Sequence, residues 1–310
     1  MDLILNDFPK TELEFDKLFG TEQACFDYLA GKKAEQGFVC SSCGHEKFWH
    51  SKRGLQICEK CEHQHSLTSG TIFHGSKKPL TMWFKVIWWY TTRKSGVNAK
   101  NLQELLGISY PTAWSWLQKL RSASVRPARE KLSGEVEVDE FYLGGKQEGK
   151  AGRGSENKIK VIVAVEKKGT QLGRIRMKQI PSCDAENLKA FIEDNIEKGT
   201  KVVTDGWKGY LPLSSNEDFD HQALVASISG EDVTPGVHRV ASLFKRVAIG
   251  TYQGRISPKH AQKYLDEYVF RFNRRKSKSV GLKFMRMVEL VALSSLMPFA
   301  KIVQQQLEYS

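Results

Sequence analysis

The sequence predicts a multi-domain α/β protein, in which a mixed β-sheet follows a small cysteine-rich module and a pair of short helices. Four cysteines stand in two Cys-x-x-Cys pairs within residues 40–61. Two helical patterns then meet at Gly107, and from about residue 133 the hydrophobic pattern changes from helical spacing to alternation. At 310 residues the chain has room for two or three domains.

The charge distribution indicates a polyanionic partner. The formal net charge is +12, and residues 241–290 hold twelve Lys and Arg against three acidic residues. Such a concentration suits nucleic acid bound through its phosphates, although a solvated basic surface is the simpler alternative. No apolar run approaches the roughly 18 residues of a membrane-spanning helix, and no targeting signal is recognisable. We therefore expect a cytoplasmic protein.

The cysteine pairs predict a structural zinc site. Two Cys-x-x-Cys turns separated by fourteen residues can place four thiolates around one Zn²⁺. The alternative is disulfide bonding, which the missing secretory signal and the unpatterned remaining cysteines disfavour. Four cysteine ligands leave no open coordination position, so this zinc would fold a ribbon over residues 40–75 without doing chemistry. The expected ligands are Cys40, Cys43, Cys58 and Cys61.

The region around the ribbon is expected to be helical. Residues 1–39 carry short helical patterns, and residues 80–132 contain a helix from about residue 81 to 93, a helix pair and a basic linker. In the pair, Gly107 closes the first helix and Pro111 lies in the first turn of the second, as in a helix-turn-helix. A plain helical hairpin is the alternative. The side chains expected to face solvent or a DNA groove are Thr112, Ser115, Gln118 and Lys119.

Residues 133–295 are expected to form the mixed-sheet domain, and residues 296–310 a C-terminal tail. The strands are expected at 135–143, 158–165, 173–180, 201–205 and, less clearly marked, 222–225; a polar, glycine-rich loop covers residues 146–157. A helix follows Asp184 after the third strand, and two helices close the domain. Three strands, helix, strand, helix, strand, helix is the order of an RNase H-like α/β domain.

Two aspartates occupy positions where such a sheet would present them. Asp139 lies in the middle of the first strand, where a buried carboxylate needs compensation such as a metal ion. Asp205 ends the fourth strand, and sites in mixed α/β sheets gather at such strand ends. Together they could hold divalent cations for phosphoryl transfer. The alternative is that Asp139 is an exposed strand acid and Asp205 a turn former.

A helix beginning at Thr234 and Pro235 could complete this site. On one polar stripe of that helix, His238 and Lys245 lie two turns apart. A neutral imidazole can ligate a metal or orient a water, and an ammonium group can hold a phosphate. The competing metal ligands are Glu231 and Asp232, and a surface histidine is the plain alternative.

A basic cluster crowds the end of the next helix. It exceeds what a helix C-terminus needs to offset its dipole, so phosphate contact is the better interpretation. Its members are Arg271, Arg274, Arg275, Lys276 and Lys278.

Several short sequence motifs resemble those of bacterial insertion-sequence transposases of the ISXO-type group. These proteins have an N-terminal zinc ribbon and an RNase H-like DDE-type domain. The motifs span nearly the whole chain in the expected order. The matching motifs are Asp7-Phe-Pro-Lys-Thr11, Gly37-Phe-Val-Cys-Ser-Ser-Cys-Gly44, Ser69-Gly-Thr-Ile-Phe-His-Gly75, Val138-Asp-Glu-Phe-Tyr-Leu-Gly-Gly145, Thr204-Asp-Gly-Trp-Lys-Gly-Tyr210, Val237-His-Arg-Val-Ala-Ser-Leu-Phe-Lys-Arg246 and Tyr264-Leu-Asp-Glu-Tyr-Val-Phe-Arg-Phe-Asn-Arg-Arg275.

The resemblance implies that Asp139 and Asp205 are catalytic metal ligands for two Mg²⁺ ions. Many relatives then have Glu or Asn with a basic residue seven positions downstream; here Lys245 fits the basic position, and seven residues earlier stands His238. The sequence thus departs from a strict DDE triad. The implied activity is cleavage and joining of DNA at terminal inverted repeats, by a homo-oligomer associated with the bacterial nucleoid. A DNA-binding regulator with an inactive nuclease-like domain and a stand-alone nuclease are the alternatives.

Overall fold

The computed structural model describes residues 8–35, 37–52, 54–126, 128–144, 158–225 and 232–304. Contacts divide these residues into two compact units, which hold residues 8–126 with 276–304 and residues 128–275. Sequence analysis placed residues 276–295 with the sheet, whereas this division puts them in the first unit. The predicted glycine-rich loop, 146–157, lies outside the described residues. In the part of the chain described, no helix combines the length and hydrophobicity needed to cross a bilayer.

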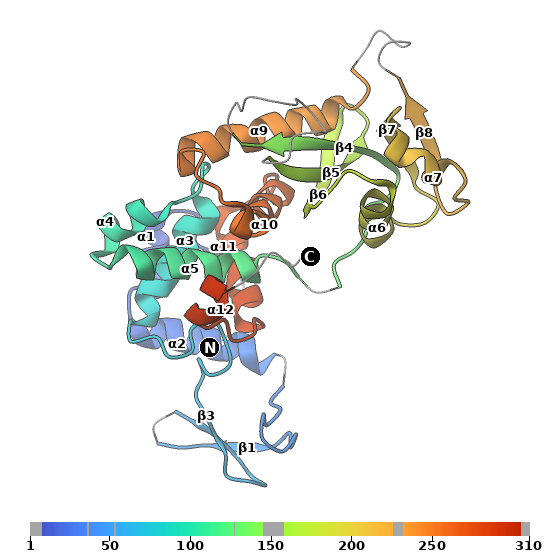
Figure 1. Ribbon diagram of the computed structural model, residues 1–310. Coiled ribbons are helices and arrows are strands. Elements are labelled where there is room, and N and C mark those ends of the chain that lie inside the picture. Colours follow the sequence, from blue (N-terminus) through green and yellow to red (C-terminus); the bar gives the residue numbers. More distant parts are fainter. Residues whose placement is uncertain are drawn as a thin grey trace. The chain divides into compact units, whose positions relative to one another are not determined.

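The first unit combines a small antiparallel sheet with helices (Figure 1). The strands are β1 (Phe48–His50), β2 (Gln56–Cys58) and β3 (Gln64–His65). The helices are α1 (Glu12–Phe19), α2 (Glu22–Ala34), α3 (Leu80–Thr92), α4 (Ala99–Leu106), α5 (Tyr110–Ala123), α11 (Val280–Ala292) and α12 (Phe299–Gln304).

Aromatic packing explains why α11 joins the first unit. Phe284 of α11 is fully buried, and its ring centroid lies 5.2 Å from that of Phe15 and 5.8 Å from that of Phe84. Such aromatic pairs contribute beyond the area that they bury. Helix α11 therefore completes the core formed by α1, α2 and α3, although about 160 residues of sequence separate it from α5.

The predicted helix pair is present. Helix α4 ends at Gly107, whose φ of 60° is in the left-handed region that glycine adopts without strain. Ser109 then caps α5 by accepting a hydrogen bond from the amide of Thr112, and Pro111 occupies the first turn. The local sequence thus determines both helix ends.

The second unit contains a five-stranded mixed sheet in the order β6-β5-β4-β7-β8. The β4–β5 and β5–β6 pairs are antiparallel, and the β4–β7 and β7–β8 pairs are parallel. This is the arrangement expected of an RNase H-like domain, so the predicted fold class is confirmed. The strands are β4 (Glu135–Leu143), β5 (Ile159–Lys168), β6 (Gln171–Ile180), β7 (Lys201–Asp205) and β8 (Asp220–Leu224).

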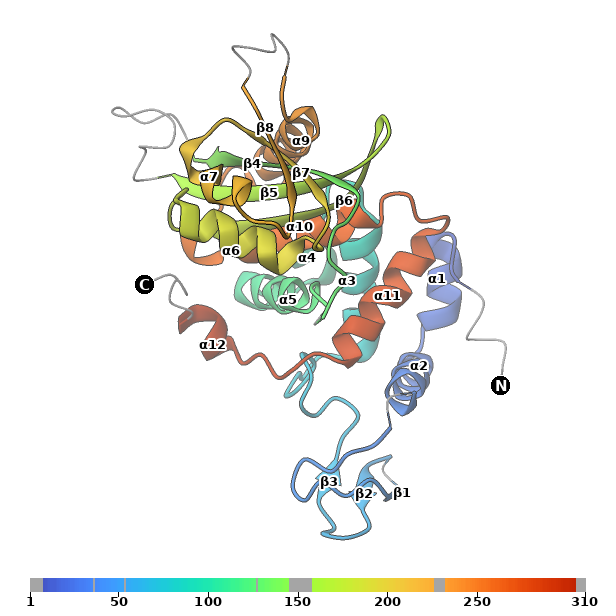
Figure 2. The same cartoon turned by 90° about the vertical axis from the view of Figure 1, so that its right-hand side faces the viewer.

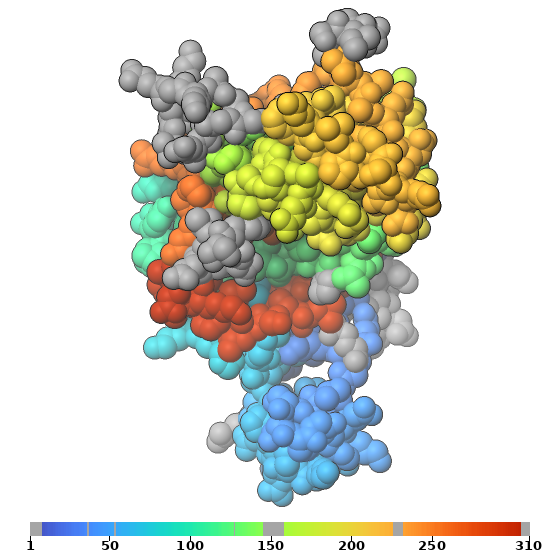
Figure 3. Space-filling view, turned by 45° about the vertical axis from the view of Figure 1, so that its right-hand side comes forward, coloured from blue at the N-terminus to red at the C-terminus, as the bar shows by residue number. Residues whose placement is uncertain are grey.

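Helices cover both faces of this sheet (Figures 1 and 2). Helices α9 (Pro235–Tyr252) and α10 (Ala261–Asn273) pack on one face. Helices α6 (Ala185–Asn195) and α7 (Leu211–Ser214) belong to the other, with the short 3₁₀ segment η2 (Lys208–Tyr210). In the space-filling view, yellow-green α6 lies beside the gold β7–β8 segment (Figure 3). A second 3₁₀ segment, η3 (Pro258–His260), precedes α10.

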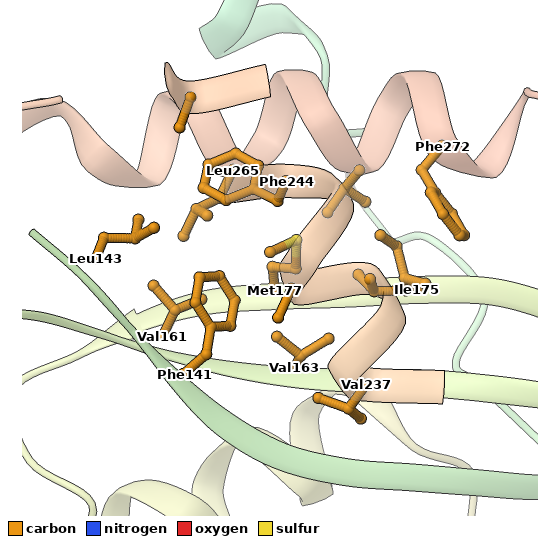
Figure 4. Packing of buried hydrophobic residues seen from close by; sticks show 14 of the residues in the cluster. Phe141, Leu143, Val161, Val163, Ile175, Met177, Val237, Phe244, Leu265 and Phe272 are labelled. Carbon is orange, nitrogen blue, oxygen red and sulfur yellow. The ribbon is translucent and has the colours of Figure 1, made fainter. Parts of the chain in front are cut away.

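A hydrophobic core lies on each face of the sheet, and the side chains of β4 alternate between these two cores. Phe141 points toward α9 and packs near Phe244 and Val161 (Figure 4). Val136 and Val138 point the other way, into the core beneath α6. Asp139 shares the α9 face with Phe141, so the fold directs its carboxylate toward the beginning of α9.

Candidate active site and zinc site

Strands β4 and β7 bring the two predicted catalytic aspartates together. Their parallel register pairs Val138 with Thr204, so Asp139 and Asp205 follow at adjacent positions on neighbouring strands. Asp139, Glu140 and Asp205 each offer one carboxylate oxygen, and these three atoms lie within 4.8 Å of one another. Three carboxylates at this separation form a donor set of the hard oxygen type that Mg²⁺ prefers.

Sequence analysis missed Glu140 as a member of this group. Alternation along β4 puts its side chain on the face opposite Asp139, so the strand pattern alone does not predict a shared site. The pairing of β4 with β7 ends at Val138 and Thr204, however, so Glu140 lies beyond the paired part and can reach around the end of β7. The available signal was its position directly after Asp139.

The carboxylate of Asp139 is buried and hydrogen-bonded. The residue is only 7% exposed. Its Oδ2 accepts a hydrogen bond from Thr234 Oγ1 at 2.8 Å, and its Oδ1 accepts one from the amide of Glu140 at 2.7 Å. Oδ1 of Asp205 accepts a hydrogen bond from the amide of Trp207 at 3.2 Å. These bonds provide part of the compensation that a buried carboxylate needs.

Helix α9 places His238 beside Asp139, and its role in completing the site stays a prediction. The imidazole Nε2 lies 3.4 Å from Asp139 Oδ2, and Nδ1 lies 2.7 Å from Asp232 Oδ1. Burial lowers the pKa of His238, but the hydrogen bond to Asp232 and the charges of both aspartates outweigh it, so the net pKa is raised. Of the two acids considered as alternative metal ligands, Asp232 therefore contacts the histidine. The other, Glu231, lies outside the described residues.

Lys245 lies farther along the same side of α9. Its ammonium nitrogen is 5.4 Å from the ring centroid of Phe141, a cation–π geometry. It lines a groove of about 940 Å³ together with His238, Ser242 and the end of β4. The groove thus connects the ammonium group of Lys245 with the imidazole that contacts Asp139.

The predicted DNA-contacting side chains of α5 have unequal exposure. Thr112 is partly exposed, whereas Ser115 is 8% exposed and Gln118 is fully buried. Lys119 is half-buried and donates a hydrogen bond to the carbonyl of Ile72 at 3.0 Å. Helix α5 contacts α4, α11 and α12, which leaves little of its surface exposed. The expectation that Ser115 and Gln118 face solvent or a groove therefore differs from what the structure shows.

The arginines of the predicted basic cluster at the end of α10 contact other residues of the second unit. The guanidinium of Arg275 donates to the carbonyls of Leu172, Gly173 and Phe272 and stacks over the Phe272 ring at 3.9 Å. That of Arg274 stacks over the ring of Phe270 at 4.0 Å. A further ion pair joins Arg271 and Glu267 at 3.3 Å. DNA contact by these arginines stays a prediction, and the aromatic residues three and four positions earlier were the signal for their packing role.

The four predicted zinc ligands converge. All four sulfur atoms lie within 4.8 Å of one another, with Cys40 and Cys61 at 3.5 Å and Cys43 and Cys58 at 3.6 Å. A disulfide needs about 2.05 Å, whereas tetrahedral zinc with Zn–S bonds of about 2.3 Å separates its ligand atoms by roughly 3.8 Å. The sulfur spacing therefore fits a zinc ribbon. Sequence analysis did not single out His65, whose Nε2 lies 3.4 Å from Cys40 Sγ.

Comparison with known proteins agrees with this geometry. Residues 131–273 match the family model described as the ISXO2-like transposase domain. This segment is therefore similar to an ISXO2-like transposase domain. A relative from Halobacterium salinarum, described as an uncharacterized protein in transposable element ISH50, is 27% identical over 241 residues. The match covers 72% of this chain and 80% of the relative. Both findings support an insertion-sequence transposase, the family that the short sequence motifs resemble.

The matched segment contains the whole candidate active site. Asp139, Glu140, Asp205, His238 and Lys245 all lie inside the matched residues, whereas the four cysteines precede them. The four cysteines therefore lie outside the residues that match the family model, and the zinc ribbon rests on the spacing of their sulfur atoms alone.

Proposed function

We propose that this protein is a DNA transposase that binds the terminal inverted repeats of its insertion sequence and catalyses metal-dependent strand cleavage and strand transfer. The observation that carries the proposal is the convergence of Asp139, Glu140 and Asp205 at the end of the β4–β7 pair within a transposase domain. A DNA-binding regulator would have no use for this carboxylate group.

Asp139 and Asp205 would hold the catalytic Mg²⁺ ions, and Glu140 would supply a third carboxylate. All-oxygen donors of this kind suit Mg²⁺. When bound, a two-metal centre activates water or a 3′-hydroxyl for attack on phosphorus and stabilises the leaving oxygen. The sequence departs from a strict DDE triad, because α9 has His238 instead of an acidic residue. Glu140, directly after Asp139 on β4, offers a third carboxylate in its place.

The chain's own side chains have distinct roles in this proposal. Asp232 holds Nδ1 of His238 and thereby directs Nε2 toward Asp139, where it can orient the attacking oxygen or hold its proton. Lys245 would bind a phosphate of the DNA strand as a point charge. The groove between them would accommodate that strand.

DNA recognition would lie in the first unit and in the basic residues. The ribbon, with Zn²⁺ as a structural ion, and the α4–α5 pair would select the terminal repeats, with Thr112 and Lys119 on α5 as the proposed contacts; the buried Ser115 is no longer among them. Arg271, Arg274 and Arg275 would add phosphate contacts beyond their local packing. Because strand transfer joins two element ends to a target duplex, we propose that a homo-oligomer assembles on double-stranded DNA.

The proposal is tested with a supercoiled plasmid that carries the inverted repeats flanking this reading frame. We expect Mg²⁺-dependent cleavage at the repeats and joined products from wild-type protein, and neither from Asp139→Asn or Asp205→Asn. Glu135→Gln is the matched control, because Glu135 lies on the same strand but is exposed and pairs with Lys201. Repeat binding without cleavage would indicate a regulator instead, and cleavage without repeat preference a stand-alone nuclease.

A further inference from the structure

Glu137 lies on β4 two residues before Asp139 and on the same face, yet its carboxylate contacts helix α9 rather than the metal-binding group. Its Oε2 accepts hydrogen bonds from the backbone amides of Gly236 at 2.6 Å and Val237 at 3.2 Å. Its Oε1 forms an ion pair with Lys167 at 2.9 Å. The residue is 4% exposed. Both carboxylate oxygens are therefore engaged inside the unit.

These contacts replace a cap that α9 lacks. The first amides of a helix have no intrahelical acceptor and usually bond to the side chain at the N-cap. Here the N-cap residue Thr234 makes no such bond, because its hydroxyl donates to Asp139 instead. A carboxylate at this end also interacts favourably with the helix dipole. Glu137 thus supplies the cap from a neighbouring strand.

Gly236 makes this close approach possible. A Cβ atom at this position would lie 2.6 Å from Glu137 Oε2 and 3.1 Å from Leu172 Cδ2. Real Cβ atoms do not approach another atom this closely, so any other residue would displace the Glu137 carboxylate or the first turn of α9 and weaken the contact between them.

We propose that Glu137 is a positioning residue of the catalytic site, which acts through α9 on His238. Along β4, Glu137 and Asp139 are two residues apart, as are Gly236 and His238 along α9. The contacts of Glu137 with Gly236 and of Asp139 with His238 therefore join the first turn of α9 to β4 at two points. The inference rests on the proposed function, because it assigns a role within the same site.

The chain contains a closely matched control in Glu166. This glutamate is 2% exposed, accepts hydrogen bonds from the amides of Ser133 and Arg174, and pairs with the Arg174 guanidinium. A Cβ on Gly173 would likewise lie 2.9 Å from its Oε2. Glu166 thus has the same burial and the same kinds of partner as Glu137, but none of these partners is on α9.

The experiment compares Glu137→Gln and Gly236→Ala with the control variants Glu166→Gln and Gly173→Ala in the full-length protein. Cleavage of the repeat-bearing plasmid in Mg²⁺ gives kcat and KM, and hydrogen exchange of the peptide over residues 233–241 reports the cap without DNA or metal. We expect both test variants to lose about 10- to 100-fold in kcat at unchanged KM, the usual effect of supporting residues around a metal site. Their α9 amides should also exchange faster. The controls should keep wild-type kcat and wild-type exchange in this peptide.

Three results would overturn the inference. The first is wild-type kcat in Glu137→Gln and Gly236→Ala together with faster exchange at the start of α9, since the cap would then be irrelevant to the site. The second is an equal loss of kcat in the test and control variants, which would indicate a general loss of folding. The third is unchanged exchange in Glu137→Gln. An inactive wild-type protein would contradict the proposed function, while the exchange rates would still test the cap.

Discussion

Replacing Thr234 with valine removes one hydrogen bond from the centre of the site. Thr234 Oγ1 donates to Asp139 Oδ2 at 2.8 Å, and both residues are buried. Valine puts a methyl group where the hydroxyl was and keeps the β-branched shape. Because the Thr234 side chain makes no capping bond to α9, the helix loses no cap in this variant.

The expected cost follows from the charge of the acceptor. A hydrogen bond to an ionised group contributes about 1.5–3 kcal/mol, and its loss leaves Asp139 less well compensated in a buried position. At about 1.4 kcal/mol per factor of ten, the second unit should unfold roughly 10- to 100-fold more readily. Thr234→Ser retains the donor and is the matched control.

The assay is urea-dependent hydrogen exchange of β5 peptides in a chelating buffer, which reports on the second unit separately. We expect Thr234→Val to open at lower urea concentration than the wild type, and Thr234→Ser to stay close to the wild type. Equal stability of the valine variant and the wild type would refute the view that this hydrogen bond compensates the buried carboxylate. So would a serine variant as unstable as the valine variant.

Three further predictions concern other parts of the chain. Removing zinc with a chelator, or substituting Cys58→Ala, should unfold residues 40–75 and release one zinc ion per chain by metal analysis, whereas Cys25→Ala should do neither. Phe284→Ala should destabilise the first unit by about 3–5 kcal/mol in urea unfolding, and the exposed Leu13→Ala should cost far less; equal effects would contradict the assigned core. Burial lowers the pKa of His221, so the unfolded chain binds its proton more readily and stability should fall as pH drops below the ordinary value of 6.5. In His221→Gln this part of the pH dependence should vanish, and an unchanged pH profile of urea midpoints would contradict the assignment.

Local sequence patterns predicted most of the fold because its elements follow short-range rules. Alternation located β4 and assigned Phe141 to one core and Val138 to the other. Gly107 and Pro111 marked the helix pair through backbone geometry alone. An acid in the middle of a strand indicated that Asp139 needs compensation, and hydrogen bonds from Thr234 and from the amide of Glu140 provide part of it.

The remaining features depend on long-range contacts that no local pattern contains. Glu137 and Asp139 share one face of β4, and only the position of α9 shows that the first caps a helix while the second joins a carboxylate group. Glu140 reaches that group because β7 ends early. Arg275 was predicted as a DNA contact, but two of its three carbonyl partners lie about 100 residues away along the chain.

The most direct test of the central claim is to locate the metal site by Fe²⁺-mediated cleavage of the polypeptide. Fe²⁺ that replaces Mg²⁺ between Asp139 and Asp205 generates oxidants that cut the nearby backbone in the presence of ascorbate. The account predicts fragments that end near residues 139 and 205, which disappear when Mg²⁺ competes and in Asp205→Asn. Cleavage elsewhere, or cleavage at these positions that neither Mg²⁺ nor the substitution changes, would contradict it.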